Sequence, residues 1–316
     1  MAIYSESWFI HGVNAAVEQA SQQTRALTTG ATQIKTGVVG KTAAFNVLDS
    51  VEMTAATTRD GDTVYLNPNQ TKRRAILTDW HAAILIDEFD ELKTLTNPQS
   101  EFIQALVAAR NRKIDDFVLS AFGAALTGGA MGLATVVNES GESTSTSALP
   151  TGTIYFRGQQ VGTAGQVIAN GGTGMTLAKV RGAGYLMNAQ AVDAQDRFMF
   201  YSPRGAEQLL RDPQVTSADF ASVKRLEAGG FGEDETWMGF KWRMSTQLPL
   251  VSGTTIRGCV AIQKRGVGVA MGLVKEVRVS DAPHKWNNTQ CVVKLSGGAV
   301  RILDPHVVEI DIDESV

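Results

Sequence analysis

The chain has 316 residues, of which 19% are charged, and its formal net charge of −3 gives an isoelectric point near 5.9. This length is enough to bury a sizeable core in two domains or in one elaborated domain. The slightly acidic balance argues against a dominant basic face that grips nucleic-acid phosphates, and no apolar run approaches the length of a membrane-spanning helix.

The N-terminal stretch offers little material for a core. Residues 13–27, VNAAVEQASQQTRAL, predict a modest helix with Ala-rich and Gln-rich faces and few large apolar groups. Such a helix is not stable alone and needs another surface to lie on. We therefore interpret residues 1–40 as an arm rather than a domain.

Residues 41–88 predict a long antiparallel excursion. One limb runs out through KTAAFNVLDSVEMTAAT, Asp60-Gly61 supplies the turn, and a second limb returns through RRAILTDWHAAILID. Few large apolar groups lie near the tip, and a two-stranded hairpin of this length is not stable in isolation. Its outer part must therefore lie on something, and a neighbouring subunit is the economical candidate.

Residues 98–127 predict one long helix of about 45 Å. Asn97 can cap it, Pro98 suits its first position, and Gly128-Gly129 can end it. Its apolar side chains fall within one third of the circumference, so one face is buried. The residues of this stripe are Ile103, Leu106, Val107, Ile114, Phe117, Val118, Ala121 and Ala125, whereas Glu101, Gln104, Asn111, Arg112, Asp115 and Asp116 lie outside it.

Arg110 falls inside the apolar stripe of this helix. One interpretation is that its stem lies along apolar surface and its charged head reaches water. The other is that it pairs with a carboxylate on another segment and pins two elements together.

The second half of the chain mixes short strands with two further helices. Residues 130–175 are rich in Gly, Ser and Thr and resemble loops on one side of a domain. A helix capped by Thr176 runs to about Asp193, RFMFYSP is typical of a fully buried strand, and Pro203 opens another helix that Pro213 closes. The tail alternates strands and turns without a regular βαβ repeat, so the predicted fold class is α+β.

No motif predicts a cofactor, a metal or a catalytic set. Gly40-Lys41-Thr42 lacks the first glycine and the preceding strand of a phosphate loop. The glycines of the stretch GVGVAMG are followed by a strand where a dinucleotide site needs a helix. The acidic cluster of Asp87, Glu88, Asp90 and Glu91 is better explained by a solvated face or by pairing with basic residues such as Lys72, Arg73 and Arg74. The histidines are scattered, and the two cysteines, Cys259 and Cys291, favour free thiols.

The order of the elements is more informative than any motif. The chain resembles a tailed-bacteriophage major capsid protein with the Hong Kong 97 fold over nearly its whole length. The stretches that carry the resemblance are SEFIQALVAARNRKIDDFVLSAFGAAL in the long helix and the closing series MGFKWRMSTQLP, GCVAIQKRGVGVAM and SGGAVRILDPHVVEIDI.

This resemblance implies a domain plan. Residues 1–40 would be the N-terminal arm, and residues 41–88 the extended loop. Residues 89–134 and 269–316 would form a peripheral domain around the spine helix 98–127, and residues 135–268 an axial domain. The boundary near 268 is the least well defined.

The resemblance also implies a function that resides in interfaces between copies. Hexamers and pentamers of the chain would build an icosahedral virion head around double-stranded DNA, after assembly in the host bacterial cytoplasm. A separate scaffolding protein, a portal and a decoration protein are the implied partners, together with non-specific proximity to DNA; no enzyme activity, cofactor, metal or membrane is implied.

Charged residues of the extended loop are the candidate inter-subunit contacts, namely Arg59, Asp60, Asp62, Lys72, Arg73 and Arg74. Arg110 is the candidate for pairing on the spine helix. Two alternatives stay open at this point. One is an encapsulin-type compartment shell, which shares the fold and encloses enzymes, and the other is an enzyme whose site is assembled from scattered residues.

Overall fold

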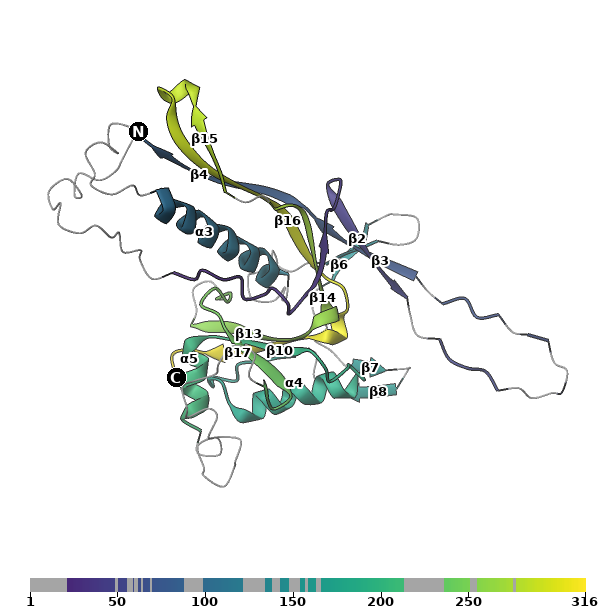
Figure 1. The fold of residues 1–316 in the computed structure, drawn as a ribbon. Coiled ribbons are helices and arrows are strands. Elements are labelled where there is room, and N and C mark those ends of the chain that lie inside the picture. The colour runs from purple at the N-terminus through teal and green to yellow at the C-terminus, as the bar shows by residue number, and fades with distance from the viewer. Residues whose placement is uncertain are drawn as a thin grey trace.

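The chain folds into three α-helices and four β-sheets within the described residues of the computed structural model (Figure 1). Those residues are 22–48, 51–55, 59, 62–63, 65–68, 70–87, 99–121, 134–137, 143–147, 154–156, 159–162, 166–212, 236–250, 255–274 and 277–316. Helices and strands interleave in the chain, so the predicted α+β class is confirmed.

The largest sheet has six strands in the order β11-β12-β10-β13-β17-β9. The strands are β9 (Val167–Ile168), β10 (Arg197–Tyr201), β11 (Thr236–Trp237), β12 (Phe240–Met244), β13 (Ile256–Gln263) and β17 (Val307–Asp313). The β10–β12 and β17–β9 pairs are parallel, and the others are antiparallel. All five residues of β10 are buried, as the apolar run in the sequence predicts.

Two helices accompany this sheet, α4 (Leu177–Ala189) and α5 (Pro203–Leu210). Thr176 caps α4 and Ser202 caps α5, because each side chain accepts a hydrogen bond from a backbone N–H of the first helical turn. Both predicted starts are therefore confirmed. Helix α4 ends four residues earlier than predicted, since the chain turns at Ala191, whose φ of 53° is left-handed.

The second sheet has five strands, and the long strand β16 is its centre. The strands are β1 (Gln33–Thr36), β4 (Thr78–Ile86), β14 (Val267–Val274), β15 (Arg278–Ala282) and β16 (Asn288–Arg301). Along one edge β16 pairs with β4, and along its other edge it pairs first with β15 and then with β14. Strand β1 extends the sheet by parallel pairing with β14.

Helix α3 (Gln99–Ser120) lies on β16 and β4. Near its N-terminal end Leu106 packs in a buried cluster with Cys291 and Val293 of β16. Towards its C-terminal end Phe117 stacks on Trp80 of β4, with ring centroids 5.5 Å apart. The helix therefore connects the five-stranded sheet to the main core, which also contains residues of β10, β13 and β17.

The start of α3 agrees with the sequence prediction, but its length does not. The helix ends at Ser120, where the N–H of Ala121 bonds to the carbonyl oxygen of Val118 and tightens the last turn. Its 22 residues span about 33 Å rather than about 45 Å. Residues 122–127 of the predicted helix lie outside the described ranges.

Two direct crossings between the two large sheets lie at neighbouring short helices among the described residues. These are η2 (Lys264–Gly266), between β13 and β14, and η4 (Asp304–His306), between β16 and β17. A Cβ on Gly266 would lie 2.7 Å from the Cβ of His306, so only glycine allows the two crossings to pack this closely. The N–H of Ile302 also bonds to the Gly266 carbonyl oxygen at 2.7 Å.

These crossings modify the grouping expected from the sequence. The predicted domain plan joined residues 269–316 in one unit, but β17 pairs with β13 in the six-stranded sheet. Likewise, the predicted returning limb of the extended loop is divided at Leu77. Strand β3 (Gln70–Ile76) pairs with β2 (Thr42–Leu48), whereas β4 pairs with β16. Strand period alone cannot identify such partners, because alternation gives the face of a strand and not its neighbour.

The remaining strands form two small sheets. Strands β5 (Ala134–Val137) and β6 (Ser143–Ser147) extend the β2–β3 hairpin into a sheet of four, with β5 next to β3. Strands β7 (Ile154–Phe156) and β8 (Gln159–Gly162) pair only with each other among the described strands. Together with β9 of the six-stranded sheet, these strands show that the Gly-, Ser- and Thr-rich stretch contributes to three sheets and not only to loops.

Candidate assembly surface

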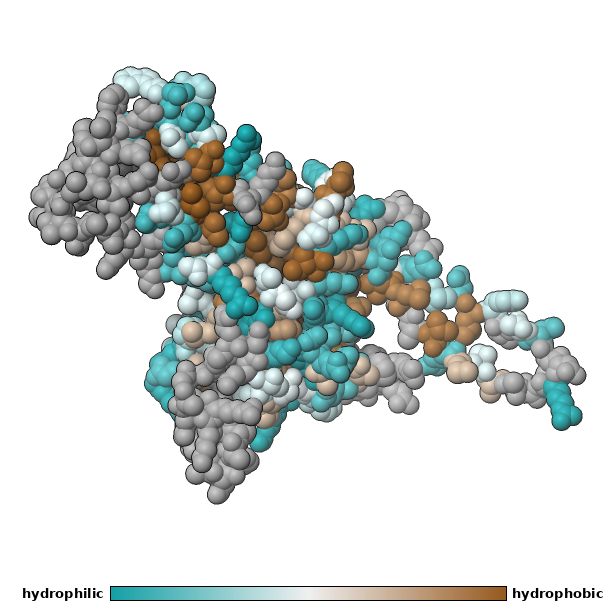
Figure 2. Space-filling model, in the orientation of Figure 1, coloured by the Kyte–Doolittle hydropathy of each residue, from teal (hydrophilic) through white to brown (hydrophobic). Residues whose placement is uncertain are grey.

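The β2–β3 hairpin projects away from the two large sheets (Figure 1). Beyond β2 and before β3 the chain carries exposed large apolar side chains, and Figure 2 shows apolar surface along this projecting segment. Met53 is 100% exposed and Tyr65 is 90% exposed. Leu48, Val51 and Leu66 are exposed as well. Apolar side chains concentrated on a projecting segment mark an interaction surface.

The base of the hairpin is packed tightly against the five-stranded sheet. Phe45 and Ala75 lie in a buried cluster with residues of β14 and β16. A Cβ on Gly268 would lie 2.7 Å from the Phe45 ring, and a Cβ on Gly298 would lie 2.0 Å from the carbonyl oxygen of Ile76. The two glycines therefore permit the hairpin backbone to approach the sheet, and the direction of the hairpin is set by this contact.

An ion pair adds to the packing at the hairpin base. Arg73 of β3 donates to both carboxylate oxygens of Asp304 in η4, at 2.8 and 2.7 Å, and to the carbonyl oxygen of Arg301 at 2.9 Å. Asp304 also accepts from Nε of Arg301, which is fully buried, at 2.6 Å. The hairpin is thus connected to the place where the chain crosses between the sheets.

Burial and charge act in opposite directions on these groups. Burial lowers the pKa of Arg301, and the charge of Asp304 partly offsets this. For Asp304, burial alone would raise the pKa, but the hydrogen bond from Arg73 and the charge of Arg301 outweigh it and hold the pKa below its ordinary value. The carboxylate is therefore ionised at neutral pH and can hold both guanidinium groups.

The N-terminal arm is attached to α3 beside the apolar stripe, through Asn111 and Asp115. Asp115 is buried and accepts hydrogen bonds from the N–H of Leu27 at 2.9 Å and from the N–H and Oγ1 of Thr28 at 2.9 and 2.7 Å. Asn111 donates to the carbonyl oxygen of Thr24 at 2.6 Å, and Arg243 donates to that of Thr29 at 2.8 Å. Side chains of the body therefore hold the main chain of the arm.

This attachment corrects the helix predicted for residues 13–27. Residues 22–27 are irregular, because their main-chain groups bond to side chains of α3 and β12 instead of to one another. Residues 13–21 lie outside the described ranges. Beyond the attachment the arm continues as β1.

A second hairpin, β15–β16, projects at the far end of the five-stranded sheet (Figure 1). Its tip consists of η3 (Pro283–Lys285), Trp286 and Asn287. Trp286 is 84% exposed and has a left-handed φ of 54°. An exposed tryptophan is typical of a contact that is completed by another molecule.

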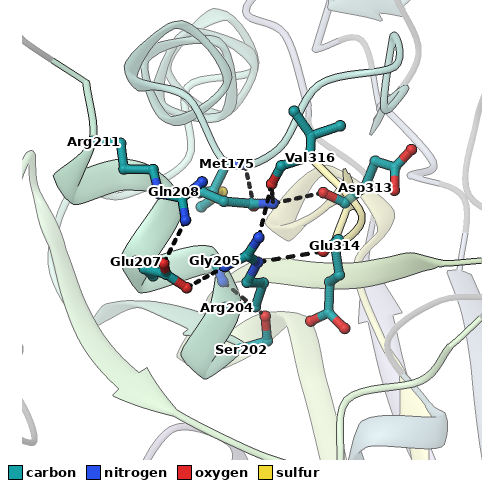
Figure 3. A network of polar contacts seen from close by, with 10 residues as sticks. All are labelled: Met175, Ser202, Arg204, Gly205, Glu207, Gln208, Arg211, Asp313, Glu314 and Val316. Carbon is teal, nitrogen blue, oxygen red and sulfur yellow. Dashed lines mark hydrogen bonds and ion pairs between the residues drawn. The ribbon is translucent and has the colours of Figure 1, made fainter.

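The short helix α5 fixes the segment that follows β17 (Figure 3). The side-chain amide of Gln208 donates to the carbonyl oxygens of Asp313 at 2.6 Å and Val316 at 3.1 Å, and it accepts from the N–H of Met175 at 2.9 Å. Arg204 donates to the carbonyl oxygens of Glu314 and Val316. Side chains of α5 therefore hold the main chain at the end of β17.

The predicted contact residues are distributed along the β2–β3 hairpin. Arg59, Asp62 and Lys72 are exposed, Arg74 is half-buried, and Asp60 lies outside the described residues. Arg73 has the intramolecular partner Asp304, which sequence reasoning did not identify. Arg110 is half-buried on α3, and its pairing with another segment stays a prediction.

The described residues contain no group of three or more His, Cys, Asp and Glu side chains that could hold a metal ion. Burial raises the pKa of Cys259 to about 12 and also raises the pKa of Cys291, so both thiols are protonated at neutral pH. Gly40-Lys41-Thr42 leads into β2, not into a helix. Of the acidic cluster, only Asp87 belongs to the described part of the chain.

None of the helices in the described ranges is both long and apolar enough to cross a membrane.

Comparison with known proteins identifies the family. A family model described as phage capsid protein matches residues 6–314. The chain belongs to the phage capsid protein family. No curated protein sequence matches it.

Solved capsid structures share the fold of this capsid protein. The capsid of cyanophage P-SCSP1u superimposes with a TM-score of 0.65 at 16% identity, covering 94% of this chain and 90% of that one. The capsid of Ralstonia phage GP4 gives 0.66 at 12% identity and covers 95% and 94%. The cyanophage Pam1 capsid gives 0.63 at 13% identity and covers 99% of both chains. The Hong Kong 97-type fold predicted from the sequence is confirmed, and the protein is a phage major capsid protein, a component of the virion.

Proposed function

We propose that copies of this major capsid protein assemble into hexamers and pentamers, which close an icosahedral head around double-stranded DNA. The observation that carries the proposal is the β2–β3 hairpin, which is fixed at its base and exposes Met53 and Tyr65 on its outer part. Burying each of these side chains on a neighbouring subunit would contribute roughly 1.5–3 kcal/mol. Repeated around a ring, such contacts suit cyclic assemblies.

The structure supports a modified domain plan. We propose a peripheral domain built from α3 and the five-stranded sheet, and an axial domain built from the six-stranded sheet with α4 and α5. The extended loop would end near Ile76, since β4 pairs with β16, and β17 would belong to the axial domain. Residues 22–36 would be the body-proximal part of the N-terminal arm.

The same proposal covers the partners. A separate scaffolding protein and a portal would guide assembly in the host bacterial cytoplasm, and a decoration protein could bind the finished head. Packaged DNA would lie near the shell without a dedicated site, which agrees with the mildly acidic chain. The function would reside in interfaces, without enzyme activity. Membership in the phage capsid family favours a virion head over an encapsulin-type compartment.

A double substitution tests the role of the hairpin. Met53→Ser with Tyr65→Ser removes the exposed apolar groups, and Val39→Ser is the matched control because Val39 is 97% exposed but lies outside the hairpin. Since all three side chains are exposed, both variants are expected to melt within about 0.5 kcal/mol of the parent. Size-exclusion chromatography and negative-stain electron microscopy should then find small species for the double variant and closed shells for the control. Normal shells from the double variant would refute the assembly role of the hairpin.

A further inference from the structure

Two acidic side chains lie together inside the six-stranded sheet. Glu309 and Asp311 occupy alternate positions of β17, so both point to the same face of the sheet. Glu309 is fully buried, and neither of its carboxylate oxygens accepts a hydrogen bond from the N–H and O–H donors that the structure describes. The same is true of Oδ1 of Asp311. A buried carboxylate in this position is costly unless its charge is neutralised.

The neighbouring strands do not neutralise this charge. Val260 of β13 and Val167 of β9 stand beside Glu309 in the sheet. The basic groups that act on the pair among the described residues are Arg301 from β16, which acts on Glu309, and Lys179 from α4, which acts on Asp311.

Both of these basic groups also donate elsewhere. Nε of Arg301 donates to Asp304 at 2.6 Å. Nζ of Lys179 donates to four main-chain carbonyl oxygens at 2.8 to 2.9 Å, including that of Asp311. Lys179 therefore donates to the main chain of Asp311 and not to the unpartnered carboxylate oxygens of Glu309 and Asp311.

A proton would satisfy the pair. Glu309 and Asp311 stand two residues apart on one face of β17, and two carboxyl groups can form a hydrogen bond with each other only when one of them is protonated. Burial raises the pKa of Glu309 to about 7, and the charge of Asp311 adds to the effect. Burial also raises the pKa of Asp311, and the charge of Lys179 opposes this. The pair titrates as one unit.

We propose that Glu309 and Asp311 share one proton at and below neutral pH, and that its loss at higher pH weakens the joint between the two large sheets. Ionised Glu309 competes with Asp304 for the buried guanidinium of Arg301. Because Asp304 also binds Arg73, the protonation state of the pair affects the ion pair at the base of the β2–β3 hairpin. This inference concerns a single chain and does not depend on the proposed assembly.

The sign of the pH dependence follows from linkage. A carboxyl group with an ordinary pKa of 4.5 ionises near that value in the unfolded chain, whereas the folded chain keeps the proton until about pH 7. Stability supplied by the pair is therefore fully present below about pH 4.5 and is lost as pH rises to about 7. For 316 residues the loss corresponds to a fall of about 5 °C in melting temperature.

Thermal unfolding of the full chain between about pH 4.5 and about pH 8 tests the proposal. Glu309→Gln keeps the shape of the side chain and can donate a hydrogen bond to Asp311. Its melting temperature should therefore fall by less than half as much as that of the parent over this pH range. The melting temperature of the exposed control Asp281→Asn should fall by as much as that of the parent. At about pH 8, hydrogen exchange of β3 should be slower in Glu309→Gln than in the parent. Equal pH dependence in Glu309→Gln and the parent would overturn the proposal.

Two further measurements distinguish proton sharing from a folding defect and from cation binding. If Glu309→Gln does not fold, Asp311→Asn replaces it, because its amide can donate to ionised Glu309 and should likewise reduce the pH dependence; an unchanged dependence would refute proton sharing. Magnesium or calcium chloride at about pH 8 should shift the melting temperature of the parent no more than it shifts that of Glu309→Gln. A selective rise in the parent would show that the carboxyl groups bind a cation and that the proton assignment is wrong.

Discussion

Replacing Arg73 by alanine tests whether charge, as well as packing, holds the base of the hairpin. The guanidinium group forms a two-pronged contact with Asp304 at 2.8 and 2.7 Å. The two side chains are only 12% and 21% exposed, so solvent screens the pair weakly. Removing one partner of such a pair costs about 3 kcal/mol, which for a chain of 316 residues lowers the melting temperature by about 5 °C.

Differential scanning calorimetry of the purified chain measures this effect. Lys72→Ala is the control, because Lys72 is the exposed neighbour of Arg73 on β3 and should change stability by no more than about 0.5 kcal/mol. Arg73→Lys keeps the charge but not the planar fork, so its loss should be intermediate. Since the pKa of Asp304 lies below that of an ordinary aspartate, the difference between the parent and Arg73→Ala should be fully present at neutral pH and should shrink in acid, once the Asp304 carboxylate takes up a proton. If Arg73→Ala and Lys72→Ala melt together at neutral pH, the ion pair does not hold the hairpin.

Two other substitutions test how the arm and the hairpin are seated. Asp115→Asn should lower the free energy of unfolding by about 2 kcal/mol and speed tryptic cleavage after Arg25, because an amide cannot accept all the hydrogen bonds that the arm donates. The exposed control Asp116→Asn should be digested at the parental rate. Equal rates for the two variants would contradict this attachment. Gly298→Ala should lower the melting temperature or the yield of folded protein, because its Cβ would lie 2.0 Å from a carbonyl oxygen. The control Gly184→Ala in α4, where the nearest atom to the new Cβ is 3.9 Å away, should be neutral or stabilising. A parental melting temperature for Gly298→Ala would refute the close approach.

Features that depend on neighbouring residues could be predicted from the sequence. Thr176 and Ser202 act as helix caps because a cap bonds within one turn of its own position. Strand β10 is buried throughout because both of its faces are apolar. The family was accessible for a different reason, since the order of arm, loop, long helix and strand-rich tail is preserved even where identity to the solved capsids is only 12 to 16%.

Features that depend on distant residues could not be predicted in this way. Asp115 lies outside the apolar stripe of its helix and resembles a solvated residue in the sequence, yet its partners are main-chain groups almost ninety residues away. Arg73 was identified as a candidate contact, but its partner Asp304 is 231 residues distant. The assignment of β4 and β17 to their sheets has the same origin, because hydrophobic alternation does not specify which strand lies alongside.

The continuity of β3 and β4 has a mechanical consequence. The two strands are separated only by Leu77 and follow one line from the hairpin into the five-stranded sheet (Figure 1). A force that another molecule exerts on the hairpin along this line is transmitted into β4, which is joined to β16 by nine residue pairs. The force acts parallel to the strands, so the hydrogen bonds of all nine pairs resist it together in shear instead of opening one after another from an end.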